Sequence, residues 1–241
     1  MGYQAVFQRK EIKYLLTRQQ QERVLAAMEP YMALDQYGKA TIRNIYFDTD
    51  SYRLIRRSIE KPVYKEKLRI RSYRQADPDT GVFVEIKKKY RDTVYKRRLS
   101  LPRDVAMDWL TGKCPCPQDS QIAREITYFL QYYKPLSPKV FLSYDRMAYY
   151  CRDGGDFRIT FDDNILCRQD RLCLGEAPGG AVLLPAGTVL MEIKTSGGIP
   201  LWLTRVLTKQ RIYKASFSKY GTAYQTTIAG SKDAEQLTMD N

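Results

Sequence analysis

The feature that most constrains this 241-residue sequence is a stretch, residues 64–101, in which cationic side chains recur at every second position. Neighbouring side chains of a β-strand point to opposite faces, so residues two apart share a face. The pattern predicts three strands. The first places four cations on one face: Lys65, Lys67, Arg69 and Arg71. The second groups Phe83, Glu85, Lys87 and Lys89, and the third adds Lys96 and Arg98.

A face this rich in cations repels itself unless a polyanion or interleaved carboxylates neutralise it. One such strand is typical of a solvated basic surface, but three consecutive strands favour a face that binds an anion. The formal net charge of +13 agrees with an anionic partner. Nucleic acid, a phosphate-rich small molecule and a membrane surface all belong to this class.

Several chemistries are excluded by composition. The sequence has no histidine, which removes Ser-His-Asp and Cys-His catalysis and histidine-ligated zinc. The cysteines lack the paired C-x-x-C spacing of a zinc site, and we expect reduced thiols in a cytoplasmic protein. No apolar run is long enough to span a bilayer, so we expect no transmembrane segment. Association with a membrane protein or an anionic membrane surface stays open.

The rest of the pattern predicts an α+β fold. Further strands are expected at residues 6–14, 41–47, 140–151, 157–162 and 188–195. Helices are expected after Thr17, after Asp48-Thr49-Asp50, and after Pro200, and Pro102 opens a helical insert that contains Trp109 and residues 119–133. We expect about eight antiparallel strands in a closed β-barrel, a tunnel, with flanking helices. We expect residues 1–230 to form a single domain and residues 231–241 to form a polar, disordered tail.

Three E-I-K tripeptides in strand context are the most specific feature: Glu11-Ile12-Lys13, Glu85-Ile86-Lys87 and Glu192-Ile193-Lys194. Each places a carboxylate beside an ammonium on one face, an arrangement that can bind a divalent metal next to a phosphate oxygen. Each alone is also explained by a surface ion pair. As a set lining one sheet, they favour function. If all these strands face inward, the interior is a polar tunnel that needs anions to neutralise it, and a linear polyphosphate fits such a channel.

These residues resemble the triphosphate tunnel metalloenzymes, the CYTH-like superfamily, and more closely the catalytic domain of the vacuolar transporter chaperone (VTC) family. The matching segments run in order along nearly the whole chain. They are Arg9-Lys10-Glu11-Ile12-Lys13-Tyr14, Arg43-Asn44-Ile45-Tyr46-Phe47-Asp48-Thr49, Lys67-Leu68-Arg69-Ile70-Arg71-Ser72-Tyr73, Glu85-Ile86-Lys87, Tyr144-Asp145-Arg146, Arg158-Ile159-Thr160-Phe161-Asp162, Met191-Glu192-Ile193-Lys194 and Phe217-Ser218-Lys219-Tyr220.

The resemblance implies an enzyme that makes inorganic polyphosphate from ATP with Mn²⁺ or Mg²⁺. Together with the charged face, it leads to an expected set of site residues. As catalytic residues we expect Arg69, Arg71, Lys87, Arg146 and Arg158. As phosphate-binding residues we expect Lys13, Lys67, Lys96, Arg98, Lys194, Ser218 and Lys219. As metal ligands we expect Glu192 and Glu11.

One departure from the family pattern bears on the reaction. Tunnel triphosphatases usually begin with an E-x-E-x-K strand, and here the first Glu position is Arg9. One metal-binding carboxylate is therefore missing, which favours a polymerase over a hydrolase. Hydrolysis of tripolyphosphate or a nucleoside triphosphate stays the near alternative, and a non-catalytic module that binds polyphosphate or RNA is a second. No sequence-specific nucleic acid binding is expected. The P-loop pattern is absent, because Gly112-Lys113 is followed by Cys114.

Overall fold

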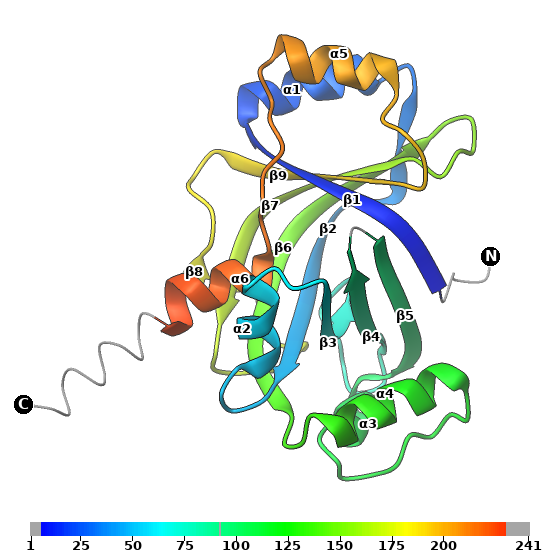
Figure 1. Ribbon diagram of the computed structural model, residues 1–241, viewed down its shortest axis with the longest axis vertical. Coiled ribbons are helices and arrows are strands. Elements are labelled where there is room, and N and C mark those ends of the chain that lie inside the picture. The colour runs from blue at the N-terminus through cyan, green and yellow to red at the C-terminus, as the bar shows by residue number, and fades with distance from the viewer. Residues whose placement is uncertain (1–5, 92, 230–241) are drawn as a thin grey trace, which may run out of the picture.

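The computed structural model describes residues 6–91 and 93–229 (Figure 1). Its strands are β1 Val6–Thr17, β2 Met32–Asp48, β3 Tyr64–Ser72, β4 Gly81–Tyr90, β5 Thr93–Pro102, β6 Ser137–Cys151, β7 Arg158–Arg168, β8 Ala181–Val182 and β9 Thr188–Thr195. Its helices are α1 Arg18–Met28, α2 Arg53–Ile59, α3 Arg103–Leu110, α4 Gln121–Tyr132, α5 Leu201–Lys209, α6 Lys219–Ala223 and a π-helical segment, η1, Tyr224–Ile228. The predicted tail, residues 231–241, lies outside the described residues.

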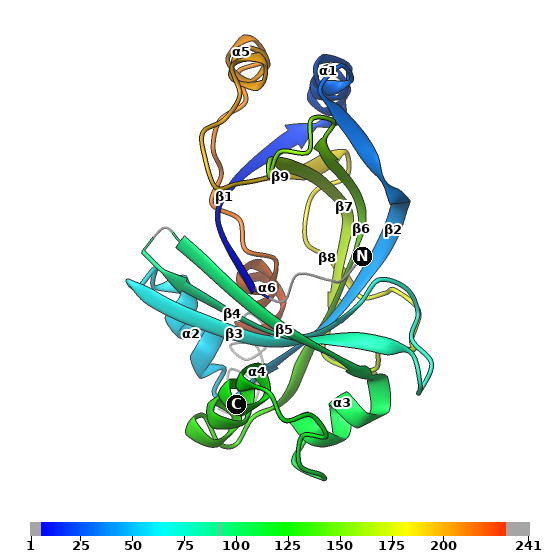
Figure 2. The same cartoon turned by 90° about the vertical axis from the view of Figure 1, so that its right-hand side faces the viewer.

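The strands form one antiparallel sheet in the order β6-β2-β3-β4-β5-β1-β9-β7-β8. β6 pairs with β2 on one edge and with β7 on the other. The strands therefore curve around a common interior, which Figure 2 shows in a view turned by 90°. The predicted α+β class, with an antiparallel sheet, flanking helices and a helical insert after Pro102, is confirmed.

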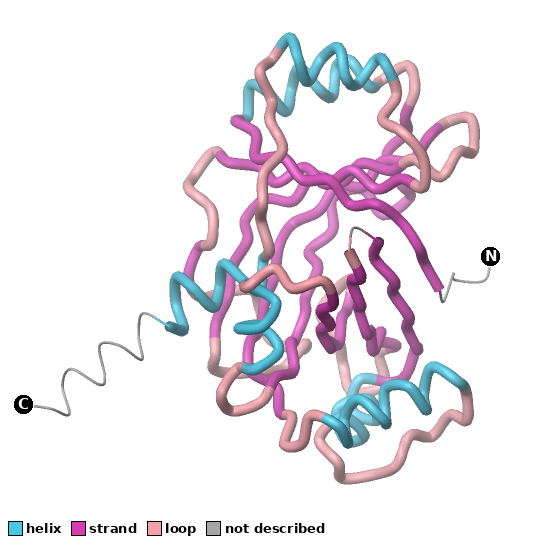
Figure 3. The backbone as a smooth tube through the Cα atoms, in the orientation of Figure 1, coloured by secondary structure: helices cyan, strands magenta, loops and turns pink. Residues whose placement is uncertain are grey.

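The sheet has two differently built faces. Figure 3 shows the helices outside the strands. α3 and α4 pack on the outer face of β3, β4 and β5 through an apolar cluster that includes Leu68, Val84 and Ile126. α1 and α5 cover β1 and β9 in the same way. α2 and α6 contribute Ile55, Tyr220 and Ala223 to a third cluster against β2 and β6. Because apolar side chains point outward to the helices, the alternate, cationic positions point inward.

β2 and β7 run well beyond the bounds that the sequence pattern predicts. β2 was expected from residue 41 but begins at Met32, because the chain crosses Gly38 in a bulge rather than ending there. Gly38 has a φ of 56°, a left-handed conformation that glycine adopts without strain, and the β2–β6 register shifts between Leu34 and Lys39. β7 was expected to end at Asp162 but continues to Arg168 because β6 pairs with it over that length.

The predicted helix starts are built as expected. The Thr17 hydroxyl accepts a hydrogen bond from the Gln20 amide N–H, and the Gln20 side chain accepts one from the Thr17 N–H, which together form a capping box. At α2, the Asp48 carboxylate accepts hydrogen bonds from the backbone N–H groups of Leu54 and Ile55. α2 itself begins at Arg53, after Tyr52 in a left-handed conformation. No helix among the described residues is long and apolar enough to cross a bilayer.

Candidate active site

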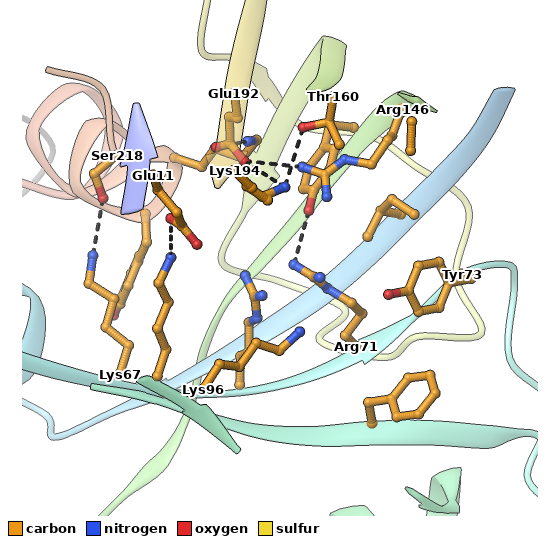
Figure 4. Close-up of a pocket in the computed structure, with 18 of the residues that line it drawn as sticks. Glu11, Lys67, Arg71, Tyr73, Lys96, Arg146, Thr160, Glu192, Lys194 and Ser218 are labelled. Carbon is orange, nitrogen blue, oxygen red and sulfur yellow. Dashed lines mark hydrogen bonds and ion pairs between the residues drawn. The ribbon is translucent and has the colours of Figure 1, made fainter. Parts of the chain in front are cut away.

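The inner faces of the strands enclose a cavity of about 1690 Å³ (Figure 4). Every residue that the sequence analysis predicted for the site lines it. They are Glu11, Lys13, Lys67, Arg69, Arg71, Lys87, Lys96, Arg98, Arg146, Arg158, Glu192, Lys194, Ser218 and Lys219. The alternation of side chains along seven strands, together with the start of α6, brings these distant segments together. Cations far outnumber carboxylates among the lining residues, so the cavity is built for an anion.

Glu85 lies beneath this cationic lining as a fully buried counter-ion. Its Oε2 accepts from Arg69 Nε at 2.8 Å, and its Oε1 lies 2.6 Å from Lys96 Nζ. Arg71 Nη1 is 3.8 Å from the same carboxylate. Burial alone would raise the pKa of Glu85, but Arg71, Lys96 and Arg69 hold it well below its usual range. Glu85 therefore differs from the glutamates of the other two E-I-K tripeptides, because it is not among the residues that line the cavity.

Asp162 on β7 plays the same part for Arg146 and Lys219. Its two oxygens accept from Arg146 Nε at 2.6 Å and Nη2 at 2.7 Å, and Lys219 Nζ lies 2.6 Å from Oδ2. Burial would raise the pKa of Asp162, yet Arg146 and Lys219 lower it. The sequence analysis included Asp162 in a segment that matches the VTC family but gave it no role. Its position in the alternation Arg158, Thr160, Asp162 was the available signal.

The two predicted metal ligands, Glu11 and Glu192, lie on adjacent strands facing the cavity. In the β1–β9 register Glu11 pairs with Lys194 and Lys13 pairs with Glu192. Glu192 lies 3.2 Å from Lys219 and 3.4 Å from both Lys13 and Lys194. Glu11 accepts from Lys87 Nζ at 2.7 Å.

Both carboxylates stay ionised. Burial would raise the pKa of Glu11, but Lys87, Lys194 and Lys13 together outweigh it and hold this pKa at about 2. Burial acts on Glu192 in the same direction, and Lys219 and Lys13 keep its pKa well below its usual range.

The described residues contain no group of three or more His, Cys, Asp or Glu side chains that could hold a metal ion by themselves. Two ionised carboxylates nevertheless suit a hard divalent cation. Mg²⁺ in phosphoryl-transfer sites is usually held by one or two carboxylates and completed by substrate phosphate oxygens and water. Glu11 and Glu192 therefore fit a metal that is bound together with its phosphate ligand.

Several lysines that line the cavity have lowered pKa values. Burial lowers the pKa of Lys96 to about 7, although Glu85 opposes the shift, and it lowers the pKa of Lys194 to about 8. Burial also lowers the pKa of Lys13, and that of Lys67 well below its usual range, where Lys87 and Lys13 add to the effect. An anion in the cavity would favour the charged forms, so binding should be coupled to proton uptake.

The sequence analysis assigned no role to two tyrosines that orient the arginines. Arg69 Nη1 donates to the Tyr46 hydroxyl at 2.9 Å, and Arg71 Nη2 donates to the Tyr144 hydroxyl at 3.1 Å. Lys219 Nζ lies 4.5 Å from the centroid of the Tyr144 ring. These contacts hold the cations apart and aimed into the cavity. Tyr144 stands two residues before Arg146 in a matching segment, so strand alternation could have placed it on the same face as Arg146.

The fold is similar to that of several solved structures. A candidate adenylate cyclase from Bacillus halodurans superposes with a TM-score of 0.57 at 14% identity, covering 89% of this chain and 96% of the other. A candidate adenylyl cyclase from Hippeastrum, described as having a dominant triphosphatase activity, gives a TM-score of 0.53 at 14% identity, covering 90% and 95%. At this identity the likeness concerns the fold alone.

A comparison with curated protein sequences found no match. The sequence profile of the VTC domain, however, matches residues 8–228. The chain belongs to the VTC domain family, as the resemblance of its strand segments predicted.

Proposed function

We propose that this protein is a metal-dependent polyphosphate polymerase that transfers the γ-phosphoryl group of ATP to a growing inorganic polyphosphate chain. The observation that carries the proposal is the extent of the cationic lining. Beyond the cluster around Glu192, the cavity continues into a lysine group, defined as Lys61, Lys65, Lys67 and Lys89. Burial lowers the pKa of Lys65, and Lys89, Lys13 and Lys61 lower it further, which indicates that these ammonium groups converge. One triphosphate does not require this second group, but an acceptor chain does.

The shape of the cavity supports an extended substrate. Its volume of about 1690 Å³ exceeds the roughly 300–1000 Å³ of ordinary small-molecule pockets. β6 pairs with both β2 and β7, and this supports a closed eight-stranded tunnel through which a linear chain could pass. The polar interior suits a polyphosphate, which carries about one charge per phosphate and, unlike nucleic acid, has no bases that the protein must recognise.

The chemistry proposed is positioning and charge neutralisation, as phosphoryl transfer requires. Arg69 and Arg71 align the triphosphate while Glu85 holds the two guanidinium groups in place. Arg146 contacts the γ-phosphoryl group from the opposite side of the cavity. Lys87 and Arg158 are further catalytic cations. The remaining predicted phosphate ligands continue along the cavity: Lys13, Lys67, Lys96, Arg98, Lys194, Ser218 and Lys219.

The attacking group in this reaction is the terminal oxygen of polyphosphate, which is already anionic. No general base is needed, which agrees with a sequence that has no histidine. Glu192 and Glu11 would hold Mn²⁺ or Mg²⁺, which when bound neutralises charge on the phosphate oxygens. Lysines now pair with both carboxylates. When phosphates bind, these lysines can pair with the phosphates instead, which frees the carboxylates to bind the metal.

Hydrolysis of tripolyphosphate or a nucleoside triphosphate needs the same binding residues, with water as the attacking group. A module that binds polyphosphate or RNA without catalysis needs only the charge. The cytoplasmic location and an association with a membrane protein or anionic membrane surface stay predictions of the sequence.

The deciding experiment incubates the purified chain with ATP and Mn²⁺ or Mg²⁺ and scores both polyphosphate on a gel and free phosphate. Long polyphosphate that is lost in Glu192→Ala and Arg69→Ala supports the proposal. Lys113→Ala is the control, because Lys113 is exposed and pairs with Asp108 in the helical insert, away from the cavity. Free phosphate without polymer would assign the tunnel to a hydrolase. Metal-independent polyanion binding with neither product would leave a binding module.

A further inference from the structure

One end of the cavity is lined by three aromatic rings, which we name the aromatic mouth: Tyr37, Tyr73 and Phe83. The Tyr37 and Tyr73 rings are inclined by 28° with centroids 6.5 Å apart. Tyr73 meets Phe83 edge to face at 5.8 Å. The guanidinium of Arg98 lies over the Phe83 ring, 4.6 Å from its centroid. Aromatic rings and a guanidinium plane thus gather where a charged cavity opens.

This cluster is not part of the apolar core. Tyr37 is 63% exposed and Tyr73 is 39% exposed, so neither ring is enclosed by the protein. Neither ring belongs to the three apolar clusters that bind the helices to the sheet. Stability alone does not require the cluster, because exposed rings contribute little hydrophobic free energy.

The fold directs Tyr37 to this place through a bulge. Residues between Leu34 and Lys39 leave the regular β2–β6 register, and Gly38 takes a φ of 56° there. The Asp35 side chain accepts a hydrogen bond from the Tyr37 N–H at 3.0 Å, which fixes the bulged backbone. Bulges at the rim of a barrel commonly re-aim a side chain beside a binding site. Here the bulged segment carries Tyr37 to Tyr73, a residue 36 positions later in the chain.

The two ends of the cavity differ in chemistry. Tyr73 follows Arg71 by two residues, about 7 Å along an extended chain. Arg71 pairs with Phe83 in the β3–β4 register. At the other end of the same strand lies Lys65 in the lysine group, and Figure 4 shows Lys67 and Ser218 on the side opposite Tyr73. The aromatic mouth therefore sits about one ribose beyond the arginines proposed to hold the triphosphate.

We propose that the aromatic mouth binds the heterocyclic base of the nucleoside triphosphate. The inference rests on the proposed function and adds the nucleoside subsite to it. Every nucleobase has a π-face that can stack on Tyr73 or Tyr37, and Arg98 adds a cation beside the rings. With the base at this end, the γ-phosphate points toward the lysine group. The acceptor chain then approaches from the lysine end, in line with the bond that breaks.

The test compares a nucleotide analogue with inorganic tripolyphosphate, which lacks the nucleoside. Binding of β,γ-imido-ATP and of inorganic tripolyphosphate to the full chain is measured by titration calorimetry with Mg²⁺. Tyr73→Ala and Tyr37→Ala should weaken the nucleotide analogue about 5- to 150-fold, the loss typical of one base–aromatic stack. Both should leave tripolyphosphate affinity within about twofold, because no phosphate contact is removed. Tyr73→Phe should bind both ligands like the unchanged protein, since it keeps the ring.

Tyr213→Ala serves as the matched control, because Tyr213 is 76% exposed and is not among the lining residues. It should change neither affinity. Nucleotide affinity unchanged in both Tyr73→Ala and Tyr37→Ala would overturn the inference while leaving the proposed function intact. An equal loss of both ligands would also overturn it, because the rings would then shape the tunnel as a whole. Failure of the unchanged protein to bind either ligand would overturn the proposed function and the inference together.

Discussion

Arg146 and Asp162 form a two-point ion pair in the wall of the cavity, with Nε–Oδ1 at 2.6 Å and Nη2–Oδ2 at 2.7 Å. The parallel geometry fixes the plane of the guanidinium, which a single contact would leave free to rotate. Lys219 lies 2.6 Å from the same Oδ2. One buried carboxylate thus positions cations from β6 and from the start of α6. The same carboxylate limits the repulsion between them.

Asp162→Asn should destabilise the fold and disorder this part of the site. The change leaves Arg146 and Lys219 buried without their counter-ion, and breaking a buried ion pair typically costs about 3–5 kcal/mol. Urea unfolding of both proteins measures the loss. Asp163→Asn is the matched control, because the neighbouring Asp163 pairs with two more exposed cations, Arg18 at 2.8 Å and Lys39 at 3.5 Å. That change should cost about 1 kcal/mol or less. Equal losses in the two variants would contradict the assignment of Asp162.

Glu192→Gln should weaken metal binding, whereas Glu85→Gln should remove the counter-ion of the buried cations. Glu192 faces the cavity and Glu85 lies fully buried beneath it. Glu192→Gln should raise the Mn²⁺ or Mg²⁺ concentration needed for half-maximal activity by at least about 10- to 100-fold. Glu85→Gln should lower the free energy of unfolding by about 3–5 kcal/mol and leave the metal requirement of the folded protein unchanged.

Activity titrated against metal concentration, together with urea unfolding, checks both variants. A shifted metal requirement in Glu85→Gln would argue that the buried carboxylate, not Glu192, holds the ion. An unshifted requirement in Glu192→Gln would remove it from the metal site.

Tripolyphosphate affinity should fall as pH rises through the range in which the buried lysines lose their charge. The pKa of Lys96 is lowered to about 7 and that of Lys194 to about 8, so in the free protein their protons leave near neutrality. Below pH 7 both ammonium groups attract the anion. Above pH 8 binding must first restore the protons, at a cost of up to about tenfold in affinity per pH unit for each group.

Calorimetry in buffers of different ionisation enthalpy should therefore show proton uptake at pH 8. Since tripolyphosphate itself titrates, the comparison is with Lys96→Arg, which keeps its charge across this range. That variant should take up fewer protons and lose less affinity between pH 6.5 and pH 9. Identical profiles for the two proteins would mean that Lys96 remains charged in the free protein.

The sequence predicted the inward cations well because strand alternation is a local property. Lys65, Lys67, Arg69 and Arg71 share a face in any extended chain, whatever packs around it. The register of β1 on β9 then brings Glu11 and Glu192 to the same wall. The side chain of Arg9, on which the polymerase prediction partly rests, lies outside the described residues.

The local sequence pattern could not predict how deeply each carboxylate is buried. Glu11 and Glu85 each begin an E-I-K tripeptide. Only Glu85, however, is enclosed by cations from both neighbouring strands, Arg69 of β3 and Lys96 of β5. That difference depends on which strands become neighbours, and strand order is not a local property. The same holds for the aromatic mouth, where a bulge in β2 brings Tyr37 to Tyr73.

Lys89→Ala should impair chain elongation while ATP binding is retained. Lys89 belongs to the lysine group at the acceptor end, remote from the arginines proposed to hold the triphosphate. Removing one partly screened charge should raise the KM for a short polyphosphate primer roughly three- to tenfold and leave the KM for ATP within about twofold. Lys88→Ala is the matched control, because Lys88 is adjacent on β4 but points to the outer face, where Lys88 Nζ lies 3.8 Å from Glu125. Steady-state rates with varied primer and varied ATP give both constants. Equal effects of the two variants would mean that the acceptor chain does not pass Lys89, and a change in the KM for ATP alone would place the nucleotide at the lysine end.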